Sequence, residues 1–269
     1  MTKIGPLGAA SSNLNTAEPG VAAAAASELE DLGYSTLWLA GGQGNNLTQI
    51  ADVVRATSRI GVASGILSVD RVPASEVAAA YTTLARTHPG RFVVGLGGAH
   101  GAKPLATLNA YLDEIDPVVP ASDRILSALG PRMLELARDR ASGAYPYLVT
   151  PDYVASAKEI LGGERQLAVL LNVVPEADPG RAREIVRGGS LAFLVTVPGY
   201  AANLRRMGFG DDDISGLTDR LVDAVTVWGG FDTIVRRIAE YRAAGADQVV
   251  LPLDSLPREW WGRLAEALG

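Results

Sequence analysis

The feature that most constrains the fold is a unit that recurs along the chain: an amphipathic helix, a glycine and a short β-rich strand. The unit reads ELEDLGYSTLWLA at 28–40, ARDRASGAYPYLV at 137–149 and AEYRAAGADQVVLPL at 239–253. We expect each helix to end at its glycine, Gly33, Gly143 or Gly245, because glycine readily adopts the left-handed conformation of a helix cap. Helices that alternate with strands in this way predict βα units and a parallel sheet.

The whole chain supplies enough such units for one barrel. The strand candidates are short and rich in Val, Ile and Leu, as expected for strands buried on both faces. Eight units in 269 residues favour a single α/β domain, residues 1–269, folded as a (β/α)8 TIM barrel. Extra helices are expected at 179–246, before the last strand. The predicted strands are 3–9, 35–39, 60–64, 91–95, 124–128, 144–148, 167–173 and 247–251.

Composition excludes several classes of function. The chain has no cysteine and only two histidines, which argues against a metal site built from thiolates or imidazoles. The net charge is −6 and the basic residues are scattered, which argues against nucleic acid as a partner. The N-terminal residues lack the apolar core of a signal peptide, and no apolar run is long enough for a membrane span. We therefore expect a soluble cytoplasmic protein.

The stretch RFVVGLGGAHGAKP, residues 91–104, combines a buried strand with a glycine-rich loop. It lacks the last glycine of the dinucleotide fingerprint and follows the fourth strand rather than the first, so a phosphate loop is disfavoured. Glycine here either lets the chain turn away from a crowded strand end or leaves room for a flat ring beside the backbone. His100 is a candidate proton donor or substrate contact, and the alternative is a loop histidine without a role.

Two other strand ends carry candidate residues. Leu129-Gly130-Pro131 leads from a strand into a helix, and backbone N–H groups at such a helix start suit a phosphate. Gly130 permits close approach, and Arg132 could help to hold the anion; the alternative is an ordinary strand-to-helix turn. Ser64-Gly65 ends another strand, where the alternative is a loop that caps the next helix.

Several segments taken together resemble a known family. RFVVGLG, ALGPRMLELARDRASGAYPYLVTP, YAANLRRMGFGDDDI and the segment from Leu217 to Leu253 are similar to the luciferase-like superfamily. Within it they resemble the actinobacterial oxidoreductases that use the deazaflavin coenzyme F420, most strongly from Arg124 to Leu253. The resemblance implies a (β/α)8 barrel with an insertion before the last strand, and a homodimer.

The resemblance also implies where a cofactor binds. A flavin-like ring would lie at the C-terminal mouth of the barrel, backed by a non-proline cis peptide that corresponds here to Ser64–Gly65. Such a cis peptide forms a bulge in the strand, and Ser64 would hydrogen-bond the ring or fix this bulge. The residues that would border the ring are Gly95 and Gly97, with Tyr147 at a neighbouring strand end. The phosphate would sit at Leu129, Gly130, Pro131 and Arg132.

The expected function is hydride transfer between coenzyme F420 and a small organic substrate. One alternative is an FMN-dependent monooxygenase or reductase on the same barrel. The other is a non-catalytic paralogue with weakened or lost cofactor binding. This last alternative rests on two atypical loops, LAGGQGNN at 39–46 and GGAHGAKP at 97–104, which follow the second and fourth strands.

Overall fold

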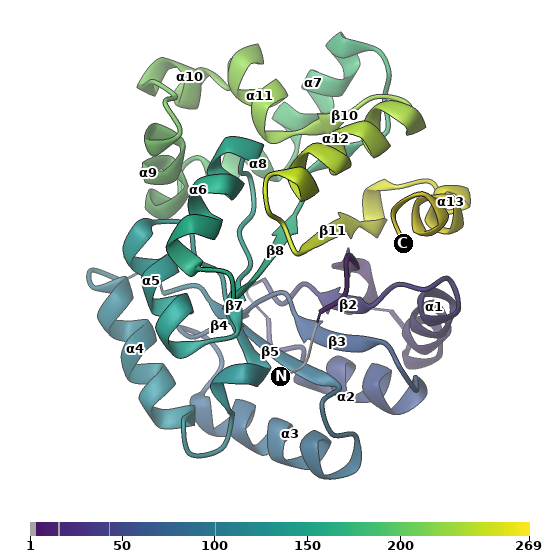
Figure 1. Ribbon diagram of the computed structural model, residues 1–269, viewed down its shortest axis with the longest axis vertical. Coiled ribbons are helices and arrows are strands. Elements are labelled where there is room, and N and C mark those ends of the chain that lie inside the picture. The colour runs from purple at the N-terminus through teal and green to yellow at the C-terminus, as the bar shows by residue number, and fades with distance from the viewer. Residues whose placement is uncertain (1–3, 16, 43, 100) are drawn as a thin grey trace.

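The protein is a closed barrel of parallel strands with a helical insertion on one side (Figure 1). The computed structural model describes residues 4–15, 17–42, 44–99 and 101–269. Within these residues, parallel pairing runs around the barrel and closes where Val62 and Ala63 pair with Phe92 and Val93. The barrel strands, in spatial order, are β1 (Leu7–Ser11), β2 (Thr36–Leu39), β3 (Gly61–Ser64) with β4 (Leu67–Ser68), β5 (Phe92–Gly97), β6 (Arg124–Leu126), β7 (Gly143–Ala144), β8 (Gln166–Leu170) and β11 (Gln248–Pro252).

Each of the eight predicted strands overlaps an observed one, so the predicted (β/α)8 barrel is confirmed. The predicted glycine caps are confirmed at Gly33 and Gly245, whose φ angles are 90° and 110°. The expectation for Gly143 is wrong. This glycine lies within β7, where a Cβ would come 1.8 Å from the carbonyl oxygen of Gln166. Glycine is needed there for close strand packing and not for a left-handed turn.

Helices surround the barrel and bury one face each against it. Several begin with proline in the first turn, where its missing N–H and fixed φ cost nothing. The helices that pack around the barrel are α1 (Pro19–Asp31), α2 (Leu47–Ala56), α3 (Ala74–Thr87), α4 (Pro104–Ile115), α5 (Pro131–Arg140), α6 (Pro151–Leu161), α12 (Phe231–Ala243) and α13 (Glu259–Leu268), with short 3-10 turns η1 (Asn13–Asn15), η2 (Ala121–Asp123) and η3 (Leu253–Ser255).

The extra helices predicted before the last strand form an insertion at the top of Figure 1. It is tied to the barrel by a small parallel sheet of β9 (Val173–Val174) and β10 (Val227–Trp228). Its apolar side chains, among them Leu204, Phe209 and Leu221, form a cluster separate from the main barrel core. The insertion helices are α7 (Pro179–Gly188), α8 (Ser190–Leu194), α9 (Pro198–Arg206), α10 (Asp211–Gly216) and α11 (Asp219–Val225).

Two stacked aromatic rings lie in the barrel interior. The rings of Trp38 and Tyr145 are 4.0 Å apart between centroids and nearly parallel. Trp38 Nε1 donates to Gln248 Oε1 at 2.8 Å, and Gln248 Nε2 donates to the carbonyl oxygen of Gly5 at 2.7 Å. The buried polar groups of Trp38 and Gln248 are therefore paired across the barrel.

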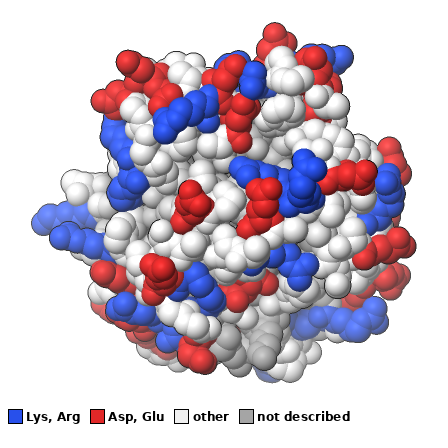
Figure 2. Space-filling view, turned by 45° about the horizontal axis from the view of Figure 1, so that its top comes forward, with Lys and Arg blue, Asp and Glu red and all other residues white. Residues whose placement is uncertain are grey.

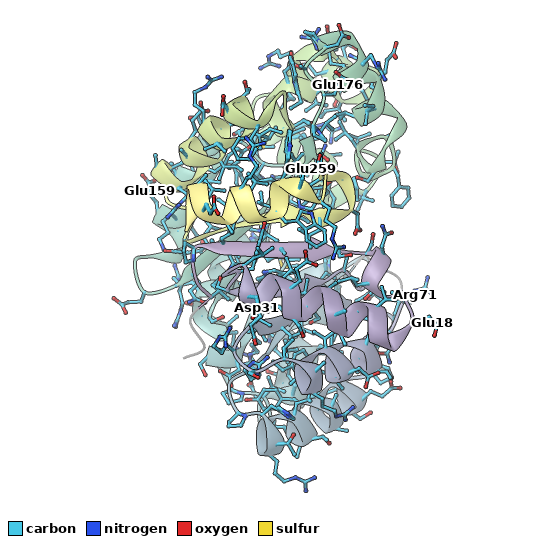
Figure 3. All side chains as sticks on the ribbon, turned by 90° about the vertical axis from the view of Figure 1, so that its right-hand side faces the viewer. Glu18, Asp31, Arg71, Glu159, Glu176 and Glu259 are labelled. Carbon is cyan, nitrogen blue, oxygen red and sulfur yellow. The ribbon has the colours of Figure 1, made fainter. Side chains whose placement is uncertain are left out.

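The two ends of the barrel can be followed in Figure 3. Glu18 and Arg71, which come shortly after β1 and β4, lie at the right-hand edge, whereas Glu159 near the end of α6 lies at the left. The C-terminal mouth of the barrel therefore faces right in that view. In such barrels the strand ends at the mouth supply the functional residues.

The surface carries interspersed charges of both signs, as the face in Figure 2 shows. In the part of the chain that the structure describes, no helix combines the length and the apolar character that a bilayer crossing requires.

Candidate functional site

The third barrel strand is interrupted between β3 and β4, and this break shapes the mouth. The Gly65–Ile66 peptide bond is cis. The expected position, Ser64–Gly65, is therefore wrong by one residue. Ser64 still belongs to the regular ladder, because it pairs in register with Leu39, and Gly65 N donates to the carbonyl oxygen of Leu39 at 2.8 Å. The strand departs from regular geometry only after Gly65.

Ser64 and Gly95 join the interrupted strand to its neighbour. Ser64 Oγ accepts from Gly95 N at 2.7 Å and donates to the carbonyl oxygen of Gly95 at 2.9 Å. The side chain of Ser64 is fully buried. Its hydroxyl thus replaces two ladder hydrogen bonds at the break. Contact of Ser64, Gly65 or Gly95 with a cofactor ring stays a prediction.

Gly97 opens onto a cavity at the mouth. A Cβ on Gly97 would lie 2.8 Å from Ser127 Cβ and 3.0 Å from Ile66 Cδ1. Beside it is a cavity of about 440 Å³, a volume within the usual range of small-molecule sites. The lining is mostly apolar and includes Gly97, Gly98, Ser127, Leu129, Gly130 and Tyr200. Glycine at position 97 therefore allows Ser127 and Ile66 to pack closely in the wall of this cavity, next to the bulge.

The predicted phosphate residues lie together at the start of α5. Gly130 is the N-cap and Pro131 the first helical residue. Tyr153 Oη donates to the carbonyl oxygen of Leu129 at 2.8 Å and so holds the turn. Gly130, Pro131 and Arg132 also line an adjoining cavity of about 700 Å³. The turn is regular, and it also faces open space that an anion can enter.

Tyr147 follows β7 and forms an isolated parallel bridge with Leu170, in contact with the insertion. Its Oη donates to Asn172 Oδ1 at 3.3 Å and lies 3.3 Å from Ser190 Oγ. Burial raises the pKa of Tyr147, which the hydrogen bond with Ser190 partly offsets. Burial also raises the pKa of Tyr145 and Tyr200. All three phenols therefore stay protonated at neutral pH and can act as hydrogen-bond donors rather than as bases.

One acid at the mouth, Asp254, is already engaged. Asp254 follows β11, and its carboxylate accepts from Ser11 Oγ at 2.6 Å and from Ser12 N and Ser12 Oγ at 2.7 Å each. It stabilises the turn after β1. No group of three or more His, Asp or Glu side chains within the described residues could hold a metal ion. His100, the candidate proton donor, lies outside the described residues.

Sequence reasoning missed two contributors to the mouth. The first is Ile66, whose carbonyl oxygen would be 2.3 Å from a Cβ on Gly41, so that the loop after β2 rests on the bulge. The glycines of LAGGQGNN were the available signal for this close approach. The second is Arg206 of α9, which lines both cavities beside Gly130. It occurs in the quoted segment YAANLRRMGFGDDDI, but no spacing rule places it at the barrel mouth.

Comparison with known proteins supports the architecture. Residues 7–118, less than half of the chain, match the model of the luciferase-like monooxygenase family. The match covers the N-terminal half, whereas the resemblance in the sequence is strongest from Arg124 to Leu253. None of the curated protein sequences matches this chain significantly.

Solved structures match over nearly the full length at low identity. The coenzyme F420 dependent tetrahydromethanopterin reductase from Methanopyrus kandleri is 17% identical with a TM-score of 0.69, covering 98% of this chain and 97% of its own. An F420-dependent secondary alcohol dehydrogenase in complex with an F420-acetone adduct is 13% identical with a TM-score of 0.74, covering 99% and 98%.

This fold is the luciferase-like TIM barrel. It is shared with proteins that bind a different flavin. The oxygenating constituent of 3,6-diketocamphane monooxygenase from Pseudomonas putida, a type II Baeyer–Villiger monooxygenase in complex with FMN, is 14% identical with a TM-score of 0.64 and covers 98% of this chain and 97% of its own. At these low identities the structural similarity establishes only the fold. The function has to be argued from the site.

Proposed function

We propose that this protein is a luciferase-like oxidoreductase that transfers a hydride between coenzyme F420 and a small organic substrate. The observation that carries the proposal is the cavity that extends from Gly97, beside the bulge at Ile66, to Gly130 at the start of α5. One end offers a flat glycine surface for a ring, and the other offers a helix start for a phosphate. The F420-dependent proteins among the matching structures support the choice of cofactor.

The residues present fit such a cofactor. A side chain at Gly97 would clash with Ser127 and Ile66, so glycine lets these two residues pack closely in the wall beside the cavity. Leu129, Gly130, Pro131 and Arg132 would hold the phosphate, and Gly97 and Tyr200 would border the ring. When bound, the deazaflavin would supply the hydride chemistry.

The protein's own residues would orient the reactants and exclude water. Helix α9 of the insertion contributes Tyr200 to the cavity wall, opposite the glycines of the loop after β5. Burial keeps the phenol of Tyr200 protonated, so it can donate to a substrate oxygen in the cavity that it lines, whereas Tyr147 Oη already donates to Asn172. The carboxylate of Asp254 is held by Ser11 and Ser12, so we do not assign it as a base. We retain His100 as the candidate proton donor or substrate contact.

Two other functions are tested by the same experiment. An FMN-dependent monooxygenase or reductase is supported by the FMN-bound Baeyer–Villiger enzyme among the matching structures. A non-catalytic paralogue is supported by the loops LAGGQGNN and GGAHGAKP, which bring no acid to the mouth.

We also propose a cytoplasmic homodimer on the basis of the sequence resemblance. Sedimentation analysis of the purified protein would test the dimer.

The deciding experiment is a pair of titrations of the purified protein, one with F420 and one with FMN, followed by the fluorescence of each ligand. Saturable binding of F420 supports the leading function. Binding of FMN alone would support the flavin enzyme instead. Failure to bind either ligand would contradict both enzymatic functions and favour the non-catalytic paralogue.

A further inference from the structure

Arg206 extends from the insertion to the start of α5, which belongs to the barrel. A Cβ on Gly130 would lie 3.1 Å from Nη2 of Arg206 and 3.5 Å from its Cζ. Arg206 lines the cavity beside Gly97, the cavity beside Arg132, and a third cavity of about 600 Å³ between α6 and the insertion. Its guanidinium therefore stands where these spaces meet, against the N-cap of α5.

The charge of Arg206 is not neutralised within the described residues. Its neighbours in the insertion are paired: Arg205 Nε lies 2.7 Å from Asp211 Oδ1, and Arg183 Nη2 lies 2.6 Å from Asp223 Oδ2. Arg206 itself has only a 3.2 Å hydrogen bond from Nη2 to Asn203 Oδ1, and no carboxylate of the described chain lies within ion-pair distance. An arginine that faces a cavity without a carboxylate has donors left for an incoming anion.

A second unpaired donor accompanies it. Asn203 is only 2% exposed, and its Nδ2 has no hydrogen-bond partner in the described structure. Asn203 lines the third cavity together with Pro131 and Arg206. A buried amide donor without an acceptor is uncommon and calls for a ligand or ordered water.

The two cavities beside Gly130 favour negative charge, whereas the third cavity is also lined by Asp152. The described residues that line the two cavities beside Gly130 include Lys103, Arg132 and Arg206 but no Asp or Glu. This is notable in a chain with 30 acidic and 24 basic residues. The N–H groups at the start of α5 add partial positive charge at the same point.

We propose that Arg206 binds the phosphate of the cofactor, so that the phosphate site is shared between the barrel and the insertion. The inference rests on the proposed function, since it assigns one more residue to the same cofactor site. Arginine suits this role because its planar guanidinium can donate two parallel hydrogen bonds to phosphate oxygens. Binding would also tie the insertion to the barrel through the ligand.

The test compares ligands with and without the phosphate; FMN and riboflavin differ in nothing else, and F420 also carries an anionic tail beyond its phosphate. The wild-type protein, Arg206→Ala, Arg206→Lys and Arg205→Ala are titrated with F420 and its phosphate-free deazariboflavin core, and with FMN and riboflavin. Arg205→Ala is the matched control, because it removes the same charge from the next position of α9, where Arg205 pairs with Asp211 at the surface. Thermal melts establish that each variant is folded.

Arg206→Ala should lower the affinity for each phosphate-bearing ligand about 10- to 100-fold and leave the affinity for its phosphate-free counterpart within about twofold of wild type. The affinity of Arg206→Lys should lie between those of wild type and Arg206→Ala, and the affinity of Arg205→Ala should equal that of wild type. Equal losses for both ligands, or no loss for either, would overturn the inference while leaving the proposed function intact. If wild type binds none of the four ligands, the proposed function fails and the inference fails with it.

Discussion

The carbonyl oxygen of Ser64 lies 1.9 Å from the position that a Cβ on Gly95 would occupy. No real side chain tolerates that separation, so β3 and β5 can pair at the break in the third strand only because residue 95 is glycine. The same two residues exchange the hydrogen bonds of Ser64 Oγ with Gly95 N and O. The contact therefore sets the geometry from which the bulge at Gly65–Ile66 begins.

Gly95→Ala should destabilise the fold. The added methyl group would meet backbone, which cannot move without disturbing the pairing of β3 and β5, and overpacking of this kind costs about 1–3 kcal/mol or more. Urea denaturation measures the loss. Gly20→Ala is the control, because nothing lies within 4 Å of a Cβ at that position in α1, and it should be neutral or slightly stabilising. A Gly95→Ala protein as stable as wild type would contradict the observed strand packing.

Ser64→Ala should also lower stability, for a different reason. Without the hydroxyl, the N–H and C=O of Gly95 lose buried partners, which costs about 1–3 kcal/mol. Affinity for the cofactor should stay within about threefold of wild type, because the hydroxyl is occupied by Gly95. Denaturation and ligand titration on the same preparation separate the two effects. A large drop in affinity at unchanged stability would instead mean that Ser64 hydrogen-bonds the cofactor ring.

Gly97→Ala should lower both stability and ring binding, because its Cβ would approach Ser127 Cβ to 2.8 Å and Ile66 Cδ1 to 3.0 Å beside the cavity. We expect a loss of about 1–3 kcal/mol. Ser127→Gly combined with Gly97→Ala should recover part of it, with a coupling energy of about 0.5–3 kcal/mol in a double-mutant cycle. Strictly additive effects of the two substitutions would mean that these positions do not touch.

Asp116 makes stability depend on pH. Arg124 Nη2 donates to its Oδ1 at 2.5 Å and Arg140 Nη2 to its Oδ2 at 2.7 Å, and these contacts lower the pKa of Asp116. A carboxyl whose folded pKa lies below its unfolded value stabilises the fold above the unfolded pKa of about 4, and this contribution is lost as pH falls through the folded pKa.

Asp116→Asn should therefore be less stable than wild type at pH 7. We expect a difference of about 1 kcal/mol, because the side chain of Asp116 is 44% exposed and solvent screens the pair. The difference should shrink as pH is lowered through the acid range, which urea midpoints at several pH values would show. Asp52→Asn, which breaks the surface pair with Arg55, is the comparison and should change stability little. A deficit that stays constant down to the lowest pH would contradict the assigned linkage.

The barrel could be predicted from the sequence because its cause is local and repeated. Each buried strand and each amphipathic helix has its own pattern, and a regular alternation of the two leaves few topologies. Glycine is less informative by itself. Gly245 and Gly143 stand in the same sequence context, yet one provides a left-handed turn and the other allows close approach of Gln166.

The candidate site could be predicted only in part, because its main contacts join distant segments. The turn Leu129–Gly130–Pro131 follows from local composition, and the structure places it beside open space. The position of the cis bond depends on how far Ser64 stays paired with Leu39 and Gly95, which no local pattern reveals. The approach of Arg206 to Gly130 depends on how the whole insertion packs against the barrel.

The most direct test of the central claim is a crystal structure of the protein with F420 bound. We predict that the ring lies in the cavity beside Gly97 and Ile66, with its phosphate at the start of α5 in contact with Arg206. A ring bound elsewhere on the molecule, or a phosphate away from Gly130 and Arg206, would contradict the account.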